Sequence, residues 1–330
     1  MKVALLAVHP MVRDVVFAPA VLKDIGRAVE LRDVTADLAS GRWPGHPDAE
    51  LVITGWGTPR IDGDALSSMP RLAAVFHAAG SVRDVTSEEL WNRGIQVVSA
   101  ADANNESVAD FVLAQIVLAL KGSHRAGAVM RSEQRLPGFR AGPGTLRQAV
   151  GLVSFGSIAR KVRERLARFD ADVLVWDPYV DDADLASSRV RRAASLEELF
   201  ATSAVVSVHT PLVPGATEHL ITADLLARLR PGAVFLNTSR GAVVDQAALV
   251  SVLGERPDVL AVLDVTWPEP PDPESPLFDL ANVVLTGHSA GSVGTENQRM
   301  GDLVRDEVLA FADAQTLKHT VTRDQARLRA

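Results

Sequence analysis

The chain has 330 residues, 47% hydrophobic and 23% charged, which is the balance of a globular protein and too long for one ordinary hydrophobic core. Its net charge of −7 comes from 34 basic and 41 acidic residues, with no dense Lys/Arg block of the kind that binds nucleic acid. It has no cysteine, which excludes disulfides, thiolate metal ligands and a thiol nucleophile, and fits a reducing compartment.

The N-terminal segment is not expected to be a signal peptide. The apolar run Lys2–Val8 is short, and Asp14 interrupts the apolar stretch that follows it. No apolar run approaches the roughly 18–20 residues that a membrane span needs. We therefore expect a cytoplasmic protein without a membrane partner.

Short apolar runs of β-forming residues alternate with helical stretches along the chain. They predict a first series of strands at Val3–Val8, Leu51–Thr54, Leu72–Phe76 and Gln96–Ser99. A second series is predicted at Val150–Phe155, Asp172–Trp176, Ala204–His209, Ala233–Asn237, Leu260–Val265 and Val283–Thr286. Continuous apolar strands separated by helices indicate parallel sheets covered on both faces. The predicted fold class is therefore α/β.

Polar residues mark several helix starts. Thr86-Ser-Glu-Glu89 and Ser195-Leu-Glu-Glu198 fit the capping box, in which side chains bind the free N–H groups of a first helical turn. Thr222 and Asp245 are further expected N-caps. The stretch Ser107–Leu120 is apolar on nearly all sides, which predicts a buried helix.

Two segments are predicted to be irregular. The Pro/Gly/Arg-rich stretch Arg131–Gly144 is expected to form a surface loop. The polar, basic tail after Asp313 is expected to cover the first part of the chain or to fray.

The second series opens with a strand, a tight turn and a helix start. The spacing G-x-G-x-x-G maps onto Ser154, Gly156 and Ala159, so only the middle glycine is present and the match is weak by itself. Asp177 ends the next predicted strand, 21 residues after Gly156. An acid there accepts hydrogen bonds from adenosine ribose hydroxyls and repels a 2′-phosphate. Turn and acid together favour a dinucleotide site that prefers NAD over NADP.

Several segments share a pattern of charged and small residues. Three of them are Leu236–Leu249 (LNTSRGAVVDQAAL), Leu263–Pro270 (LDVTWPEP) and Leu285–Ser292 (LTGHSAGS). Together with Val208–Leu212 and Asn104–Asp110, they resemble the D-isomer-specific 2-hydroxyacid dehydrogenase family. The resemblance covers most of the chain in the family's order, which makes it more specific than any single motif.

The resemblance implies a Rossmann-type nucleotide-binding domain inserted into a smaller flavodoxin-like substrate domain, with the active site in the cleft between them. It places the NAD-binding domain at 101–292 and the substrate domain at 1–100 plus 293–330. The apolar helix near Ser107 corresponds to the family's dimer-forming element, so a homodimer is also implied. The implied activity is hydride transfer between NAD(H) and a 2-keto acid or D-2-hydroxy acid, such as glyoxylate or hydroxypyruvate.

Reduction of a 2-keto acid requires a cation for the carboxylate, an acid for the carbonyl oxygen and a hydride donor. Arg240 has a planar fork that suits a carboxylate, and His288 is the natural proton donor because histidine titrates near neutrality. Read alone, Arg240 could be a helix-cap residue and His288 one structural histidine among eight. The resemblance adds Glu269 as the partner of the protonated imidazole. It also implies that the backbone of Ala79, Gly80 and Ser81 binds the substrate carboxylate together with Arg240.

The sequence departs from the family at two places in this set. Both outer glycines of the loop 79–81 are replaced, and Gly287 stands where the family has a proline before the histidine. Pocket shape and histidine placement are therefore open. The expected cofactor contacts are Gly156, Ser157, Ile158, Asp177, Thr210, Thr238, Ser239, Asp264 and Gly291, with Asp264 facing the nicotinamide carboxamide.

An NAD(H)-sensing, corepressor-like binding protein on the same fold is the alternative, since such proteins can retain the triad. A formate or phosphite enzyme is disfavoured because formate enzymes replace Glu269 with glutamine. No metal is expected, because the histidines show no paired spacing such as H-x-x-x-H. The identity of the 2-keto acid is open. Residues that select it are expected in the N-terminal domain and at Leu136–Phe139.

Overall fold

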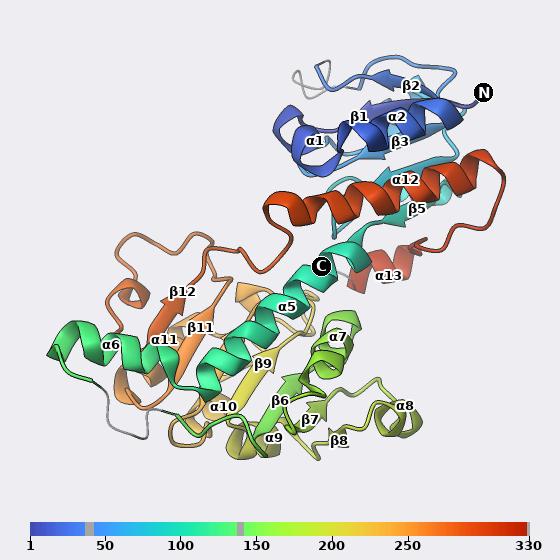
Figure 1. The fold of residues 1–330 in the computed structure, drawn as a ribbon. Coiled ribbons are helices and arrows are strands. Elements are labelled where there is room, and N and C mark those ends of the chain that lie inside the picture. Colours follow the sequence, from blue (N-terminus) through green and yellow to red (C-terminus); the bar gives the residue numbers. More distant parts are fainter. Residues whose placement is uncertain (37–42, 137–141, 329–330) are drawn as a thin grey trace. The chain divides into compact units, whose positions relative to one another are not determined.

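The computed structural model describes residues 1–36, 43–136 and 142–328, and it divides into two compact α/β units (Figure 1). The first unit contains Met1–Asn105 and Ser292–Ala330, and the second contains Glu106–Gly291. The chain thus leaves the first unit once, builds the second, and returns to complete the first.

A five-stranded parallel sheet forms the centre of the first unit, with strand order β2-β1-β3-β4-β5. The strands are β1 (Val3–Ala7), β2 (Glu30–Asp33), β3 (Leu51–Thr54), β4 (Ala74–His77) and β5 (Gln96–Ser99). β1, β3 and β4 are buried along their whole length, as expected for parallel strands covered on both faces. The order of strands reverses between β1 and β3, where open α/β sheets bind their ligands.

Helices cover both faces of this sheet. One face carries α1 (Pro10–Val16), α2 (Pro19–Ala28) and α12 (Gln298–Ala312), whose apolar side chains form one core cluster. The other carries α3 (Gly63–Ser68), α4 (Glu88–Asn92) and α13 (Arg323–Leu328). The tail pairs with β5 through hydrogen bonds from Ser99 N to His319 O at 3.1 Å and from Val321 N to Val97 O at 2.8 Å. The C-terminal segment therefore covers the first unit up to residue 328.

The second unit contains a seven-stranded parallel sheet with strand order β12-β11-β10-β9-β6-β7-β8. Its strands are β6 (Ala149–Val153), β7 (Asp172–Trp176), β8 (Arg191–Arg192), β9 (Val205–Val208), β10 (Val234–Asn237), β11 (Leu260–Leu263) and β12 (Val283–Leu285). β6 lies between β7 and β9, so the order reverses beside β6. All seven carboxyl ends lie on one edge, which is where a Rossmann-type sheet binds a dinucleotide.

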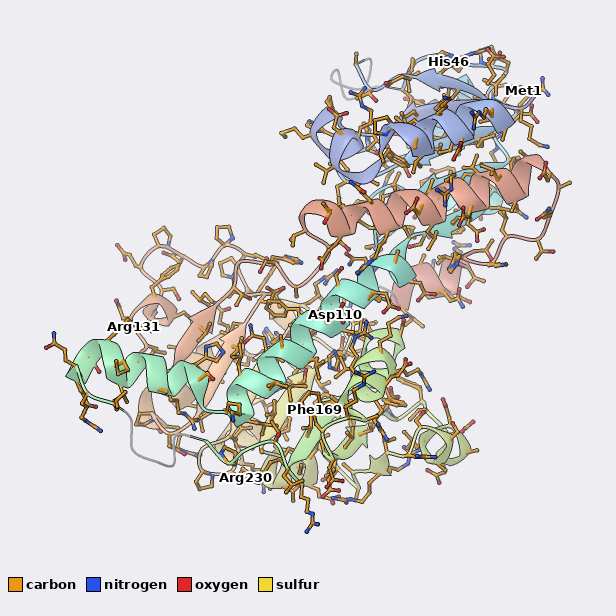
Figure 2. All side chains as sticks on the ribbon, viewed as in Figure 1. Met1, His46, Asp110, Arg131, Phe169 and Arg230 are labelled. Carbon is orange, nitrogen blue, oxygen red and sulfur yellow. The ribbon has the colours of Figure 1, made fainter. Side chains whose placement is uncertain are left out.

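Two core clusters cover the faces of this sheet. One is formed with α5 (Ala101–Leu120) and α7 (Ser157–Leu166), and the other with α9 (Leu196–Thr202), α10 (Ala223–Ala227) and α11 (Gln246–Glu255). The remaining helices of the unit are α6 (Ser123–Glu133) and α8 (Asp182–Ser187). Asp110 on α5 (Figure 2) and Glu106 both accept hydrogen bonds from Arg165 at 2.6 Å. These bonds fix α7, the helix that follows the nucleotide turn.

The predicted α/β class and all ten predicted strands are confirmed, with ends that differ by at most two residues. Two strands were not predicted, β2 and β8. Their residues are exposed or half-buried and, except for Leu31, charged, so these strands lack the apolar signature of the central strands.

The predicted helix starts are confirmed at three of four sites. The side chains of Ser195 and Asp245 cap α9 and α11. The cap of α4 is Ser87 rather than Thr86, because the Thr86 hydroxyl donates to Val82 O instead. Thr222 occupies the N-cap position of α10 without a side-chain bond.

The predicted loop Arg131–Gly144 is wrong at its start, where α6 continues to Glu133. Residues 137–141 of that stretch lie outside the described residues. Within the described parts of the chain, no helix is long and apolar enough to cross a membrane.

Candidate active site

His288 and Glu269 form a close polar pair in the second unit. His288 Nδ1 lies 2.6 Å from Glu269 Oε1, and because an ionised carboxylate only accepts, the imidazole donates. The two side chains remain 52% and 38% exposed, respectively. With Nδ1 directed at the carboxylate, Nε2 is the nitrogen left to exchange a proton with a bound molecule.

Asp264 holds the backbone around His288 through several hydrogen bonds. The buried Asp264 carboxylate accepts bonds from the Thr286 hydroxyl at 2.6 Å, Ser289 N at 2.8 Å and Ala290 N at 3.1 Å. His288 N also donates to Asp264 O at 2.7 Å. His288 and Gly287 both have positive φ, 56° and 65°. Glycine suits this conformation, so replacing the family's proline at 287 is compatible with an ordered histidine loop.

Arg240 follows β10 in a loop that its own neighbours stabilise. Asn237 Nδ2 donates to Arg240 O at 3.1 Å, while Asn237 Oδ1 accepts from Ser239 N at 3.0 Å. A Cβ on Gly241 would lie 2.0 Å from the backbone of Thr266. The loop carrying Arg240 therefore packs directly against the loop that leads to Glu269, and only glycine fits at the contact.

A hollow of about 260 Å³ lies beside these loops. It is lined by Leu263, Asp264, Thr266, Glu269, Pro270, Pro271, Leu285 and Gly287. The structure thus brings Glu269, Asp264 and the histidine loop to one partly apolar depression at the carboxyl ends of β11 and β12.

Two other histidines are unsuited to proton transfer near neutrality. Burial lowers the pKa of His77 to about 4 and the pKa of His209 to about 4. His77 Nδ1 is 2.9 Å from the Thr54 hydroxyl, and His209 Nε2 is 3.0 Å from the Ser207 hydroxyl. Both rings are therefore neutral structural groups, whereas His288 is half exposed and paired with an acid.

The nucleotide turn keeps the expected geometry despite its lost glycines. Ser154 has φ 74°, the left-handed conformation that a first glycine would supply. A Cβ on Gly156 would meet no atom within 4 Å, so the glycine leaves open space in front of α7, whose N-terminus has no side-chain cap. Ala159 is fully buried in the core beneath α7. An alanine therefore satisfies the helix–sheet packing of the third position.

Asp177 lies directly after β7 and contacts the nucleotide turn. Its carboxylate accepts hydrogen bonds from Phe155 N and Tyr179 N, both at 2.8 Å. Each carboxylate oxygen has a second lone pair, so acceptors remain for the hydroxyls of a ribose. Asp177 thus orders the turn in addition to any role in cofactor choice.

Thr238 provides a test of whether a cofactor fits at this edge. Its hydroxyl is buried and has no hydrogen-bond partner, although it lies just beyond β10. Buried polar atoms are nearly always paired, so a bound polar group is the expected partner. The other predicted cofactor residues follow β6, β7, β9, β10, β11 and β12 on the same edge: Gly156, Ser157, Ile158, Asp177, Thr210, Ser239, Asp264 and Gly291.

The predicted carboxylate loop Ala79–Ser81 belongs to the first unit, where it follows β4. None of its residues has positive φ, so the alanine and serine that replace glycines do not strain the backbone. Ser99 Oγ donates to Gly80 O at 2.6 Å, and Ala78 N donates to Thr54 O at 2.7 Å. Interior groups thus hold the loop against the ends of β3 and β5.

Four supporting residues were missed from the sequence: Asn237, Gly241, Ser154 and Ser99. Asn237 and Gly241 flank Arg240 in the motif that carried the resemblance, so the motif itself was a usable signal. Ser154 was treated as a lost glycine and Ser99 as a strand end. In the described parts of the chain, no three His, Asp or Glu residues cluster as metal ligands.

The second unit matches a family model with the description "D-isomer specific 2-hydroxyacid dehydrogenase, NAD binding domain" over residues 113–290. The chain belongs to this family. The match confirms the resemblance drawn from the motifs, and with it the nicotinamide cofactor expected for the second unit.

Relatives and solved structures extend the match to both units. The chain is 33% identical over 296 residues to D-3-phosphoglycerate dehydrogenase of Mycobacterium tuberculosis (strain ATCC 25618 / H37Rv), covering 89% of this chain and 55% of that protein. It therefore spans about half the length of that relative. It is 30% identical over 276 residues to glyoxylate reductase of Korarchaeum cryptofilum, covering 82% of each. A phosphoglycerate oxidoreductase from Rhizobium etli shares the fold, with a TM-score of 0.82, 23% identity and 98% and 99% coverage.

Proposed function

We propose that this chain is an NAD-dependent dehydrogenase that interconverts a 2-keto acid and a D-2-hydroxy acid, with Arg240, Glu269 and His288 as catalytic residues. The observation that carries the proposal is the 2.6 Å pair between His288 Nδ1 and Glu269 Oε1. The pair lies on the same sheet edge as the nucleotide turn, in a chain of this family.

The residues divide the chemistry of keto-acid reduction between them. Arg240 binds the substrate carboxylate through its planar guanidinium and polarises the adjacent carbonyl. His288, protonated at the start, gives the Nε2 proton to the carbonyl oxygen as that oxygen gains negative charge. Glu269 holds the ring by its Nδ1 proton and stabilises the imidazolium before the transfer. In the direction of oxidation, the neutral ring accepts the alcohol proton.

The nicotinamide cofactor, when bound, supplies or accepts the hydride. Gly156, Ser157 and Ile158 are proposed to face its pyrophosphate at the start of α7, where helix N–H groups favour anions. Asp177 is proposed to bind the adenosine ribose. Thr210, Thr238, Ser239, Asp264 and Gly291 complete the proposed cofactor contacts.

The Asp264 carboxylate accepts hydrogen bonds from Thr286, Ser289 and Ala290 in the histidine loop. One of its oxygens, Oδ2, accepts only the Ala290 N–H among the described hydrogen bonds. A contact with the nicotinamide carboxamide is therefore compatible with its role in holding the histidine loop.

For the domain roles, we propose residues 1–100 plus 293–330 as the substrate domain and 101–292 as the NAD-binding domain. In the substrate domain, the backbone N–H groups of Ala79, Gly80 and Ser81 are proposed to bind the substrate carboxylate. Glyoxylate and hydroxypyruvate are the first substrates to test, since a relative of comparable length is a glyoxylate reductase. The predicted specificity stretch Leu136–Phe139 falls mostly outside the described residues.

The direct test is a panel of 2-keto acids assayed with NADH and with NADPH, following the loss of reduced-cofactor absorbance. Turnover of at least one keto acid, faster with NADH, is the expected result. NADH binding without turnover of any keto acid would instead favour the corepressor-like alternative.

We propose a homodimer on the basis of the exposed apolar side chains of α5 and α6. Leu118 is 38% exposed and Met130 is 45% exposed, and α6 has no buried residue. Figure 2 labels Arg131, which lies near the C-terminal end of α6. Sedimentation velocity is expected to give a dimer, and a single monomeric species would contradict it. The cytoplasmic location stays a prediction from the sequence.

A further inference from the structure

The nucleotide turn contains a non-glycine residue in a conformation that normally requires glycine. Ser154 occupies the first position of the G-x-G-x-x-G spacing and has φ 74°. An L-residue in the left-handed region persists only where its surroundings hold it there. Contacts with neighbouring residues must therefore hold Ser154 in this conformation.

Ser154, in the turn after β6, is hydrogen-bonded to segments on both sides of that strand. On the β7 side, Ser154 N donates to Trp176 O at 2.8 Å. On the β9 side, Ser154 Oγ lies 2.9 Å from Thr210 Oγ1. Thr210 Oγ1 also lies 3.4 Å from Val153 O, and the residue is only 3% exposed. The two hydroxyls thus join the turn after β6 to the segment after β9, across the point where the strand order reverses.

We propose that the Ser154–Thr210 hydroxyl pair is a clasp that replaces the first glycine of the dinucleotide turn and sets the turn's position for NAD binding. A glycine could adopt φ 74° unaided, whereas Ser154 needs the bond to stay there. If the clasp opens, the backbone of Ser154 can relax and move Gly156 and the first N–H groups of α7. Those groups must approach the pyrophosphate closely, so the clasp acts on cofactor affinity.

The clasp makes the Thr210 hydroxyl a positioning group that acts through Ser154, so the proposed cofactor contact of Thr210 is assigned to its backbone. The buried hydroxyl contacts both Ser154 Oγ and Val153 O, so it lies on the interior side of the nucleotide turn. This inference rests on the proposed NAD site but not on the catalytic residues or on the identity of the keto acid. If the wild-type protein binds NADH, the proposed NAD site is supported, and the variants then test the clasp alone.

The experiment measures the Kd for NADH by fluorescence titration and the Tm of each variant. Thr210→Val and Ser154→Ala each remove one hydroxyl and should raise the Kd by roughly fivefold, the factor expected for one net hydrogen bond. The double variant should be no weaker than either single variant, because the second substitution removes a bond already lost. Thr210→Ser keeps the hydroxyl and should bind NADH within about twofold of wild type.

Ser154→Gly separates the clasp from folding. Glycine adopts φ 74° without strain and needs no clasp, so this variant should melt above Ser154→Ala and should bind NADH within about twofold of wild type. Ser203→Ala is the matched control, because Ser203 is fully buried in the same unit and precedes β9 at the opposite edge of the sheet. Its Kd should equal that of wild type.

Three results would overturn the clasp. One is wild-type affinity in both Thr210→Val and Ser154→Ala. Another is weakened binding in Thr210→Val with none in Ser154→Ala, which would mean that the Thr210 hydroxyl contacts the cofactor directly. The third is additive losses in the double variant. A wild-type chain that binds no NADH would overturn the proposed function, and the clasp with it.

Discussion

The imidazole of His288 and the carboxylate of Glu269 meet at 2.6 Å between two loops that follow neighbouring strands, β12 and β11. Asp264 ties the histidine loop to the end of β11, so the same strand supports both partners. This arrangement fixes which ring nitrogen faces the acid and leaves Nε2 for the substrate oxygen.

Glu269→Gln should shift the pH dependence of both reaction directions. The carboxylate favours the imidazolium, so its loss should move the decline of keto-acid reduction toward acid pH. Oxidation, which needs the neutral ring, should extend to lower pH. The measurement is kcat/KM against pH in each direction. Glu274→Gln, an exposed acid in the same loop, is the control, and an identical shift there would remove Glu269 from this role.

Arg240→Lys should keep the charge but lose the two-pronged contact with the substrate carboxylate. We expect kcat/KM for keto acids to fall by roughly 10- to 100-fold, on the scale of 1.5–3 kcal/mol for a hydrogen bond to a charged group. The Kd for NADH should be nearly unchanged. Arg228→Lys, an exposed residue before β10 rather than after it, is the control. A comparable loss of NADH affinity in Arg240→Lys would indicate a structural role.

Asp177 should select NADH over NADPH by at least about tenfold, because an unfavourable charge contact of about 1.4 kcal/mol gives that factor. Because its carboxylate also accepts from Phe155 N, Asp177→Ala should weaken both cofactors. Asp177→Asn keeps an acceptor for the turn and removes the charge, so it should narrow the preference with a smaller loss of NADH affinity. Titration of both cofactors is the measurement. Equal wild-type affinities would refute the assignment.

His77 should make the first unit less stable in mild acid. Burial lowers its pKa to about 4 in the folded chain, against about 6.5 in the unfolded chain. The unfolded state therefore takes up the proton first, so this contribution is fully present above about pH 6.5 and is lost as pH falls toward 4. At about 1.4 kcal/mol per unit, the loss is on the order of 3 kcal/mol.

Urea unfolding near neutrality and in mild acid tests this expectation. His77→Gln should lose less stability on acidification than wild type, whereas His9→Gln, at an exposed histidine, should behave as wild type. An unchanged acid dependence in His77→Gln would show that the ring takes up its proton freely in the folded protein.

The sequence predicted the central strands because burial on both faces demands continuous apolar runs. Edge strands such as β8, with two exposed arginines, carry no such signal. The site residues at strand ends could be located for a related reason, since all carboxyl ends of a parallel sheet share one edge.

The supporting contacts could not be predicted in this way. Ser154 and Thr210 are 56 positions apart, and nothing in either segment predicts that their hydroxyls meet. Likewise, the approach of Gly241 to Thr266 depends on the three-dimensional path of two loops. Local patterns predict where a side chain lies on the sheet, whereas pairs between loops require the packed structure.

Keto-acid reduction by His288→Ala is the most direct test of the proposed mechanism. The rate of NADH oxidation with the best 2-keto acid of the panel would be compared between wild type and this variant across the neutral pH range. Loss of a general acid predicts a fall in turnover of roughly 10²–10⁴-fold, while NADH still binds. A His288→Ala variant with near-normal turnover and the wild-type pH profile would contradict the account.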